Sequence, residues 1–157
     1  MKGSVTVYMA ASPERVWSLV SDVTNTGEFS PETFDAEWLD GKTGPEVGVR
    51  FRGHVRRNGK AWLVYWTTCT ITACEPGGEF AFDVKGPSGK PAVTWRYHLE
   101  PHGEGTNVTE TFELGSSLGL RLYAVVARAS RTRTNMRNMR MTLERIKAVA
   151  ESPNETG

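Results

Sequence analysis

The chain has 157 residues, a formal net charge of +1 and 24% charged side chains. This length suits a single domain with a substantial core, and the near-neutral charge does not point to nucleic acid as a partner. No apolar run reaches the roughly 18 residues that a membrane-spanning helix needs, and the N-terminus lacks the pattern of a secretion signal, so we expect a cytoplasmic protein.

The first part of the chain predicts one strand followed by short helices. Apolar and polar residues alternate over residues 5–9, which is typical of a strand with one buried face. Ser12 and Pro13 indicate a helix start, because serine caps the first turn and proline fits its first position. We expect this helix to end at residues 25–27 and residues 28–31 to form a turn or a short second helix.

The middle of the chain predicts about six further strands in succession. The ranges with a period of two are 34–39, 49–56, 62–73, 79–84, 93–100 and 107–114. Turn-forming residues separate them, and Asn58-Gly59 is a strong hairpin signal. Short turns make consecutive strands antiparallel neighbours, and charged residues at alternate positions predict a sheet with one face in water.

Residues 118–150 predict one long helix, because apolar or small residues recur there at alternating steps of four and three. At 1.5 Å per residue such a helix is roughly 50 Å long, enough to cover a sheet face. Its apolar face is thin at Ala129, Thr132 and Met136, which favours a helix that roofs a cavity. Its first turns are apolar nearly all round, which predicts either deep burial or a surface shared with a second copy in a homodimer.

These elements predict an α+β fold in which a curved antiparallel sheet of about seven strands wraps around the long C-terminal helix. One or two short helices follow the first strand. We expect a single domain over residues 1–151 and a disordered polar tail over residues 152–157.

Several short segments also occur in a recognisable order. They are residues 5–7 (VTV), 12–17 (SPERVW), 48–53 (GVRFRG), 95–97 (WRY), 105–110 (GTNVTE) and 141–147 (MTLERIK). In this order they resemble the START-like or SRPBCC superfamily, with its helix-grip fold, and within it the polyketide cyclase/dehydrase branch. The resemblance implies a cavity between sheet and helix that holds an apolar or amphipathic small molecule, used by some members for cyclisation and by others for carrying lipids, sterols or hormones.

The leading hypothesis is therefore a protein that binds an apolar or aromatic small molecule, lipid-like or polyketide-like, between the sheet and the helix. The predicted ligand-binding residues occupy inward-facing strand positions or the thin middle of the helix, and they are Phe51, Tyr65, Thr67, Cys69, Phe82, Trp95, Tyr97, Glu110, Thr132 and Met136. Aromatic side chains at such positions serve a core and a ligand pocket equally well.

Glu110 is the candidate catalytic residue, because it shares a strand face with Val108 and Phe112. A carboxylate there is costly unless it is paired or neutral, and a raised pKa would suit acid or base catalysis. In that case the protein would be a cyclase/aromatase-type enzyme, a lyase of the dehydratase kind, with Glu110 as general base. The alternative is a bulge that places Glu110 at the rim, in water.

The remaining candidates allow other interpretations. Arg52 and His54 alternate with Phe51 and are predicted outside, unless Gly53 marks a bulge that turns one inward. The many arginines of the last helix offer a second alternative, a non-catalytic module that binds a partner or an anionic membrane surface.

The sequence predicts neither a metal site nor a cofactor. His98 and His102 lack ligand-like spacing, and no phosphate loop or dinucleotide fingerprint is present. Cys69 and Cys74 are an odd number of residues apart, which places them on opposite faces of a regular strand and predicts two free thiols.

Overall fold

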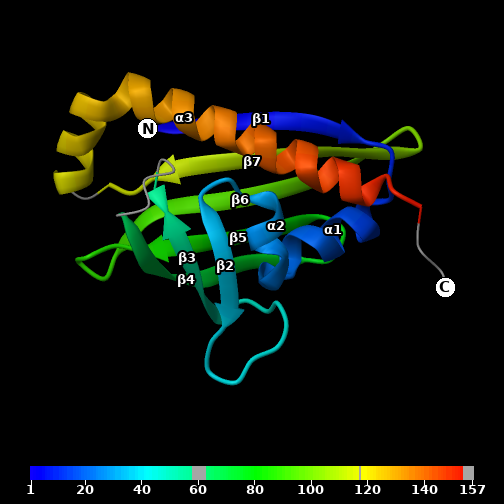
Figure 1. Cartoon of the computed structure of the whole chain (residues 1–157), viewed down its shortest axis with the longest axis horizontal. Coiled ribbons are helices and arrows are strands. Elements are labelled where there is room, and N and C mark those ends of the chain that lie inside the picture. Colours follow the sequence, from blue (N-terminus) through cyan, green and yellow to red (C-terminus); the bar gives the residue numbers. More distant parts are fainter. Residues whose placement is uncertain (58–62, 117, 154–157) are drawn as a thin grey trace.

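The computed structural model describes residues 1–57, 63–116 and 118–153, with no side-chain description for residues 118, 120–124 and 126–129. The elements in chain order are β1 (Lys2–Met9), α1 (Pro13–Ser21), the 3-10 helix η1 (Val23–Asn25), α2 (Thr26–Phe29), β2 (Thr33–Trp38), β3 (Arg50–Arg56), β4 (Val64–Glu75), β5 (Glu79–Lys85), β6 (Pro91–His102), β7 (Gly105–Leu114) and α3 (Leu118–Ala150). Figure 1 shows one curved sheet with α3 laid across it, which confirms the predicted α+β helix-grip fold.

The seven strands form a single sheet in the order β1-β7-β6-β5-β4-β3-β2, and all neighbours are antiparallel. Strands β2 to β7 follow one another in space as they do in sequence, as short turns require. The exception is the step from β1 to β2, which lie at opposite edges of the sheet. The short helices α1, η1 and α2 make that crossing (Figure 1).

The start of α1 follows the prediction, and its end does not. Ser12 Oγ accepts a hydrogen bond from the backbone N–H three residues later, at 3.2 Å. The helix ends at Ser21, before residues 25–27, because the Asp22 carboxylate starts a new turn by accepting a hydrogen bond from the Thr24 backbone N–H at 3.1 Å.

The regular alternation of β4 is interrupted near its end. The pairing of β4 with β5 shifts by one residue between Ile71 and Ala73. Cys74 consequently stands opposite Phe80, a buried core residue. The prediction that Cys69 and Cys74 lie on opposite faces is therefore wrong, because the irregularity turns Cys74 to the face that Cys69 occupies. Both are free cysteines.

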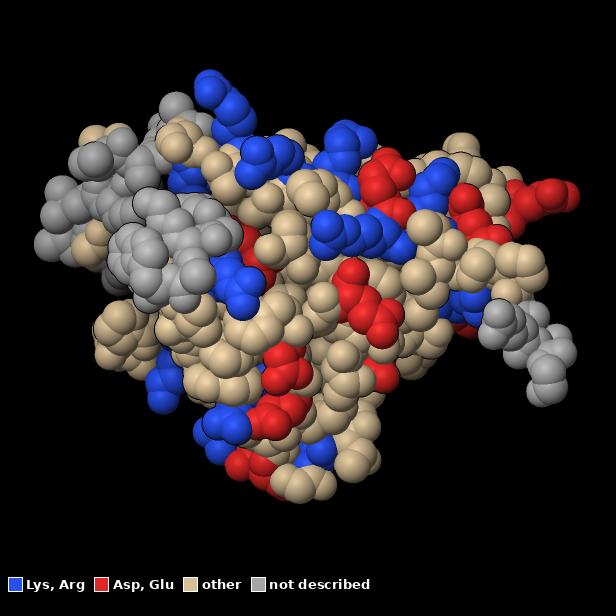
Figure 2. Space-filling model, viewed as in Figure 1, with Lys and Arg blue, Asp and Glu red and all other residues tan. Residues whose placement is uncertain are grey.

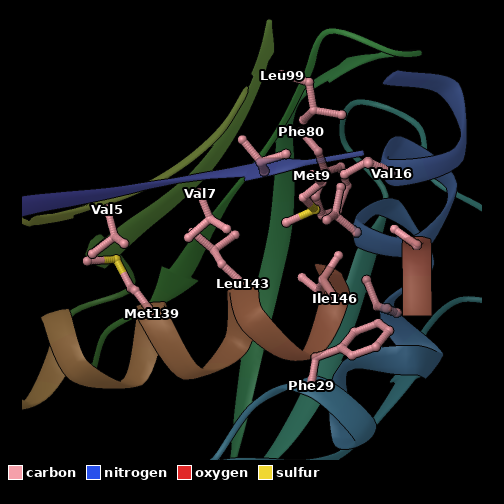
Figure 3. Close-up of a cluster of buried hydrophobic side chains, with 14 of the residues drawn as sticks. Val5, Val7, Met9, Val16, Phe29, Phe80, Leu99, Met139, Leu143 and Ile146 are labelled. Atoms are coloured by element: carbon pink, nitrogen blue, oxygen red, sulfur yellow. The ribbon is translucent and has the colours of Figure 1, made fainter. Parts of the chain in front are cut away.

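The C-terminal half of α3 forms the centre of the core. Figure 3 shows Met139 against Val5 and Leu143 against Val7, with Ile146 further along the same helix face. Met139, Leu143 and Ile146 are at most 1% exposed. Their burial is the main source of stability that this helix can supply, since an isolated helix gains little from propensity alone.

The C-terminal end of α3 is held by the beginning of the chain. Arg15 Nε donates to the carbonyl of Ala150 at 2.7 Å, and Arg15 Nη2 donates to that of Val149 at 3.0 Å. A cation is favourable at helix-end carbonyls, which carry the negative end of the helix dipole. Glu151 in turn accepts a hydrogen bond from the Ala10 backbone N–H at 2.8 Å, so β1, α1 and α3 meet at one point.

The first turns of α3 lie beyond the end of β7 in Figure 1. Val125, which belongs to the predicted apolar face, is 80% exposed there, so that face is not buried by the sheet over its whole length. The Asn58-Gly59 hairpin and residues 154–157 of the predicted tail lie outside the described residues. No helix in the described part of the chain is long and apolar enough to cross a membrane.

We predict that Leu143→Ala lowers the free energy of unfolding by about 2–5 kcal/mol, because a fully buried side chain leaves a cavity on truncation. The matched control is Met141→Ala on the same helix, 37% exposed, which we expect to cost less than about 1 kcal/mol. Urea unfolding measures both. Equal losses of unfolding free energy in the two variants would contradict the packing of the Leu143 face of α3 against the sheet.

Candidate functional site

A cavity of about 220 Å³ lies between the sheet and α3. Strands β3 to β7 form one wall, α3 forms the facing wall, and α1, η1, α2 and β2 close the space between them. Its surface combines aromatic and aliphatic side chains with polar groups from the strands, α2 and α3, and a mainly apolar wall with polar groups is the usual composition of a small-molecule site.

Every predicted strand residue lines this cavity. These residues are Phe51, Tyr65, Thr67, Cys69, Phe82, Trp95, Tyr97 and Glu110. Their common orientation follows from the register of the sheet, because directly opposite residues share a face. Phe51 stands opposite Cys69 in this way. Trp95 likewise stands opposite Phe82. Whether these residues contact a ligand stays a prediction.

The wall formed by α3 differs from the prediction. Thr132 and Met136 do not line the cavity. Met136 lies over β1 instead, since a Cβ built on Gly3 would come within 2.8 Å of its sulfur. The described residues of α3 that do line the cavity are Arg131, Asn135, Asn138, Met139, Thr142 and Ile146.

The apolar pattern of the sequence does not predict this helix face, because two of its buried residues are polar. Asn135 and Thr142 are only 6% and 7% exposed, although an apolar pattern excludes both residue types. Asn135, Met139, Thr142 and Ile146 are separated by four, three and four residues, so they lie on one face of the helix. This spacing is the signal in the sequence that could have identified the two polar residues. The buried face of α3 is therefore rotated from the apolar stripe toward these polar residues.

Glu110 is 4% exposed, and it lies on the inward face of β7 between the buried residues Val108 and Phe112. Its direct neighbour across the sheet is Tyr97 on β6. The Tyr97 hydroxyl donates a hydrogen bond to Glu110 Oε1 at 3.0 Å. Within the described part of the chain, Glu110 Oε2 is buried without a hydrogen-bond partner.

The protonation state of Glu110 follows from this burial. Burial raises the pKa of the Glu110 carboxyl to about 8, although the hydrogen bond from Tyr97 acts in the opposite direction. The pKa of Tyr97 also lies well above its ordinary value, because of burial and then of the neighbouring carboxyl. At pH 7 the pair is therefore mostly a neutral acid beside a neutral phenol, and Glu110 is a hydrogen-bond donor more often than a base.

Cys69 is a wall residue without nucleophilic character. It is 3% exposed, and burial raises the pKa of its thiol to about 12, against the smaller effect of a hydrogen bond with Thr67. Since the thiolate is the reactive form, Cys69 contributes shape to the cavity at neutral pH.

An ion pair joins the two sides of the cavity near α2. Arg131 of α3 pairs with Glu32 at 3.1 Å, and both side chains are less than a fifth exposed. Arg145 also donates to the carbonyl of Phe29 at 3.2 Å. Tyr65, 38% exposed, marks the part of the wall that reaches solvent.

The cations of α3 do not form an uninterrupted basic surface on the face drawn in Figure 2, where acidic side chains lie among them. Lys147 is engaged as well, since its Nζ donates to the carbonyl of Tyr8 at 2.8 Å and pairs with Glu151 at 3.3 Å. These contacts favour a structural role for Lys147. The ion pair of Arg131 with Glu32 and the hydrogen bond from Arg145 to Phe29 favour the same role for those two arginines.

Arg52 and His54 lie outside the cavity, on the outer face of the sheet. Strand β3 pairs with β4 without a shift through Gly53, so no bulge turns either side chain inward. The His54 ring stacks on Trp66 with centroids 4.1 Å apart, and the Arg52 guanidinium lies 4.3 Å from the same ring. Among the described residues, no three His, Cys, Asp or Glu side chains are placed to hold a metal ion.

The curved antiparallel sheet, the long helix α3 and the cavity between them define a helix-grip protein. The family model described as "Polyketide cyclase / dehydrase and lipid transport" matches residues 1–151, and the chain belongs to this family. No curated protein sequence matches the chain.

Solved structures show the same architecture. A polyketide-cyclase-like protein of Corynebacterium glutamicum is 27% identical, with 96% of this chain and 89% of that chain covered and a TM-score of 0.56. A Thermus thermophilus protein is 18% identical, with 97% and 100% covered and a TM-score of 0.72. The di-domain ARO/CYC protein StfQ of the steffimycin biosynthetic pathway is 14% identical, with 96% and 50% covered and a TM-score of 0.73. The last two likenesses show the fold alone.

The raised pKa of Glu110 predicts that the free energy of unfolding depends on pH. Between the ordinary pKa of 4.5 and the folded value of about 8, the folded chain holds a proton that the unfolded chain has lost. The stability of the protein should therefore fall as pH rises through this window and level off above it. We predict that Glu110→Gln is more stable than wild type by roughly 3 kcal/mol at pH 7, with no such gain at pH 4.

Urea unfolding at pH 4, 6 and 8 measures this difference. Glu113→Gln on the exposed side of β7 is the matched control and should show little change at any pH. A gain for Glu110→Gln that is the same at pH 4 and pH 8 would mean that Glu110 ionises normally.

Proposed function

We propose that this chain is a small-molecule-binding protein that holds an apolar or aromatic ligand in the cavity between the sheet and α3. The observation that carries this proposal is the composition of one wall, where aromatic side chains from β3, β4, β5 and β6 face a single cavity. Burial of ligand surface against such groups contributes roughly 25 cal/mol per Å². Membership of a family whose description includes lipid transport supports the same conclusion.

The size of the cavity limits the ligand. Its volume of about 220 Å³ lies between a cavity of about 150 Å³ that holds benzene and the roughly 300–1,000 Å³ of sites for drug-sized molecules. A compound with one or two rings, or a short acyl chain, fits without a change in the walls. A larger polycyclic ligand would have to extend through the open side of the cavity or displace α3 or the short helices.

A cyclase/aromatase-type enzyme is the second candidate, and Glu110 is the observation that favours it. A carboxyl with a pKa of about 8 is close to the pH at which a general base works best. In this case turnover should rise with pH up to about 8, since only the ionised fraction accepts a proton. The fold that the chain shares with the ARO/CYC protein StfQ is compatible with this candidate.

Native mass spectrometry of the protein purified from its own host, followed by identification of any released molecule, tests the binding function. We predict that Asn138→Phe, which fills the α3 wall of the cavity, loses the bound molecule. Arg137→Phe is the matched control, because residue 137 is exposed and does not line the cavity. Equal retention by both variants would place the molecule elsewhere and contradict the proposal.

Glu110→Gln separates the two candidate functions. A binding protein should keep most of its affinity, because glutamine can still accept from Tyr97 and donate to a ligand. An enzyme that uses Glu110 as its base should bind its substrate as before and lose most of its turnover.

A further inference from the structure

One polar group in the wall of the cavity lacks a partner. In the described part of the chain Glu110 Oε2 is buried and receives or donates no hydrogen bond, whereas Oε1 accepts one from Tyr97 at 3.0 Å. Buried carboxyl oxygens are rarely left in this state, and the cost of an unmade hydrogen bond persists until a partner arrives. A ligand that brings an acceptor atom next to Glu110 would remove that cost.

Two hydroxyl groups of the wall are already engaged within the protein. The Thr67 hydroxyl donates to the carbonyl of Gly53 at 3.2 Å. The Thr142 hydroxyl donates to the carbonyl of Asn138 at 2.9 Å, one turn earlier in α3. These two hydroxyls gain little from a ligand, so neither of them selects one polar ligand over another.

Charged ligands are disfavoured by the rest of the wall. The described lining contains one cation, Arg131, and it is paired with Glu32. A carboxylate brought into the cavity would therefore lose its hydration without gaining an uncommitted cation. A cationic amine would have to ionise Glu110, a buried group that the surrounding aromatic rings keep from water.

We propose that Glu110 determines the specificity of the cavity and selects small uncharged aromatic ligands that carry an acceptor oxygen, such as aryl ketones, over carboxylates and amines. Oε2 has almost no accessible surface, so a small adjustment of the side chains around it must open it to the cavity. Glu110 then donates a hydrogen bond from Oε2 to the ligand oxygen while its Oε1 continues to accept from Tyr97. The inference rests on the proposed function, because it names the class of ligand that the same cavity holds.

The donated proton makes recognition dependent on pH. On the two neighbouring strands, Glu110 stands opposite Val5 of β1 and Tyr97 of β6. The other titratable or charged groups of the described lining are Tyr65, Cys69, Glu32 and Arg131. Burial holds the pKa of Tyr97 and Cys69 well above their ordinary values, so neither loses its proton near neutral pH. With a pKa of about 8, Glu110 is the group whose proton is lost there, and the preference for a ketone should disappear above that pH.

Four compounds of nearly equal size test the proposal: ethylbenzene, acetophenone, benzoate and benzylamine. Nuclear magnetic resonance titration of the full chain gives their affinities at pH 6 and pH 9.5. Binding of ethylbenzene tests the proposed function alone, since it needs only an apolar cavity. The ratio of acetophenone affinity to ethylbenzene affinity tests the role of Glu110.

We predict that this ratio is roughly tenfold lower in Glu110→Leu than in wild type at pH 6, the effect of one buried hydrogen bond. In wild type the ratio of acetophenone affinity to ethylbenzene affinity should fall by a similar factor between pH 6 and pH 9.5. In Glu110→Gln, whose amide donates at every pH, it should stay constant, which keeps the test valid if Glu110→Leu fails to fold.

Three results would overturn the inference while leaving the proposed function intact. The first is that ethylbenzene binds, but the ratio of acetophenone affinity to ethylbenzene affinity does not depend on pH in wild type. The second is that this ratio is unchanged in a folded Glu110→Leu. The third is that benzoate or benzylamine binds more tightly than acetophenone at pH 6. If none of the four compounds binds, the proposed function fails together with the inference.

Discussion

The attachment of α3 to the sheet is the constraint on which the rest of the structure depends. A single helix has to cover the inner face of a seven-stranded sheet, and it makes its tightest contacts over its C-terminal half. Leu143 and Ile146 are buried against β1 and the short helices, while Arg15 holds the last carbonyls. Between Arg131 and Ile146 a space remains between the helix and the curved sheet, and this space is the cavity.

The walls of the cavity combine side chains that stabilise the fold with one that destabilises it. Phe80 and Phe112 are almost completely buried, as expected of a core that favours folding. Glu110 lies on the same inner face and has the opposite effect, because burial of its carboxyl costs free energy at neutral pH. Natural proteins tolerate such local costs mainly where function requires them, and Glu110 is therefore the residue that most distinguishes this cavity from a packed core.

The strand wall could be predicted from the sequence because a period of two connects residue number to sheet face. This rule correctly placed Glu110 and Tyr97 on one inner face and Arg52 on the outer face. It failed at Cys74, where a one-residue shift against β5 reverses the alternation. Nothing in the local residue types marks that shift, since it depends on how β4 and β5 fit together.

The sequence by itself determined the order of the elements, the residues that share a face within each regular stretch of strand and the presence of one helix long enough to cover the sheet, because all of these depend on local periodicity. Only the tertiary structure decided the rotation of α3, which turns Asn135 and Thr142 toward the cavity, while Met136 packs over β1. It also decided that Glu110 is a neutral acid at pH 7. Helix rotation and protonation both depend on which distant surfaces exclude water, and that is settled only when the chain has packed.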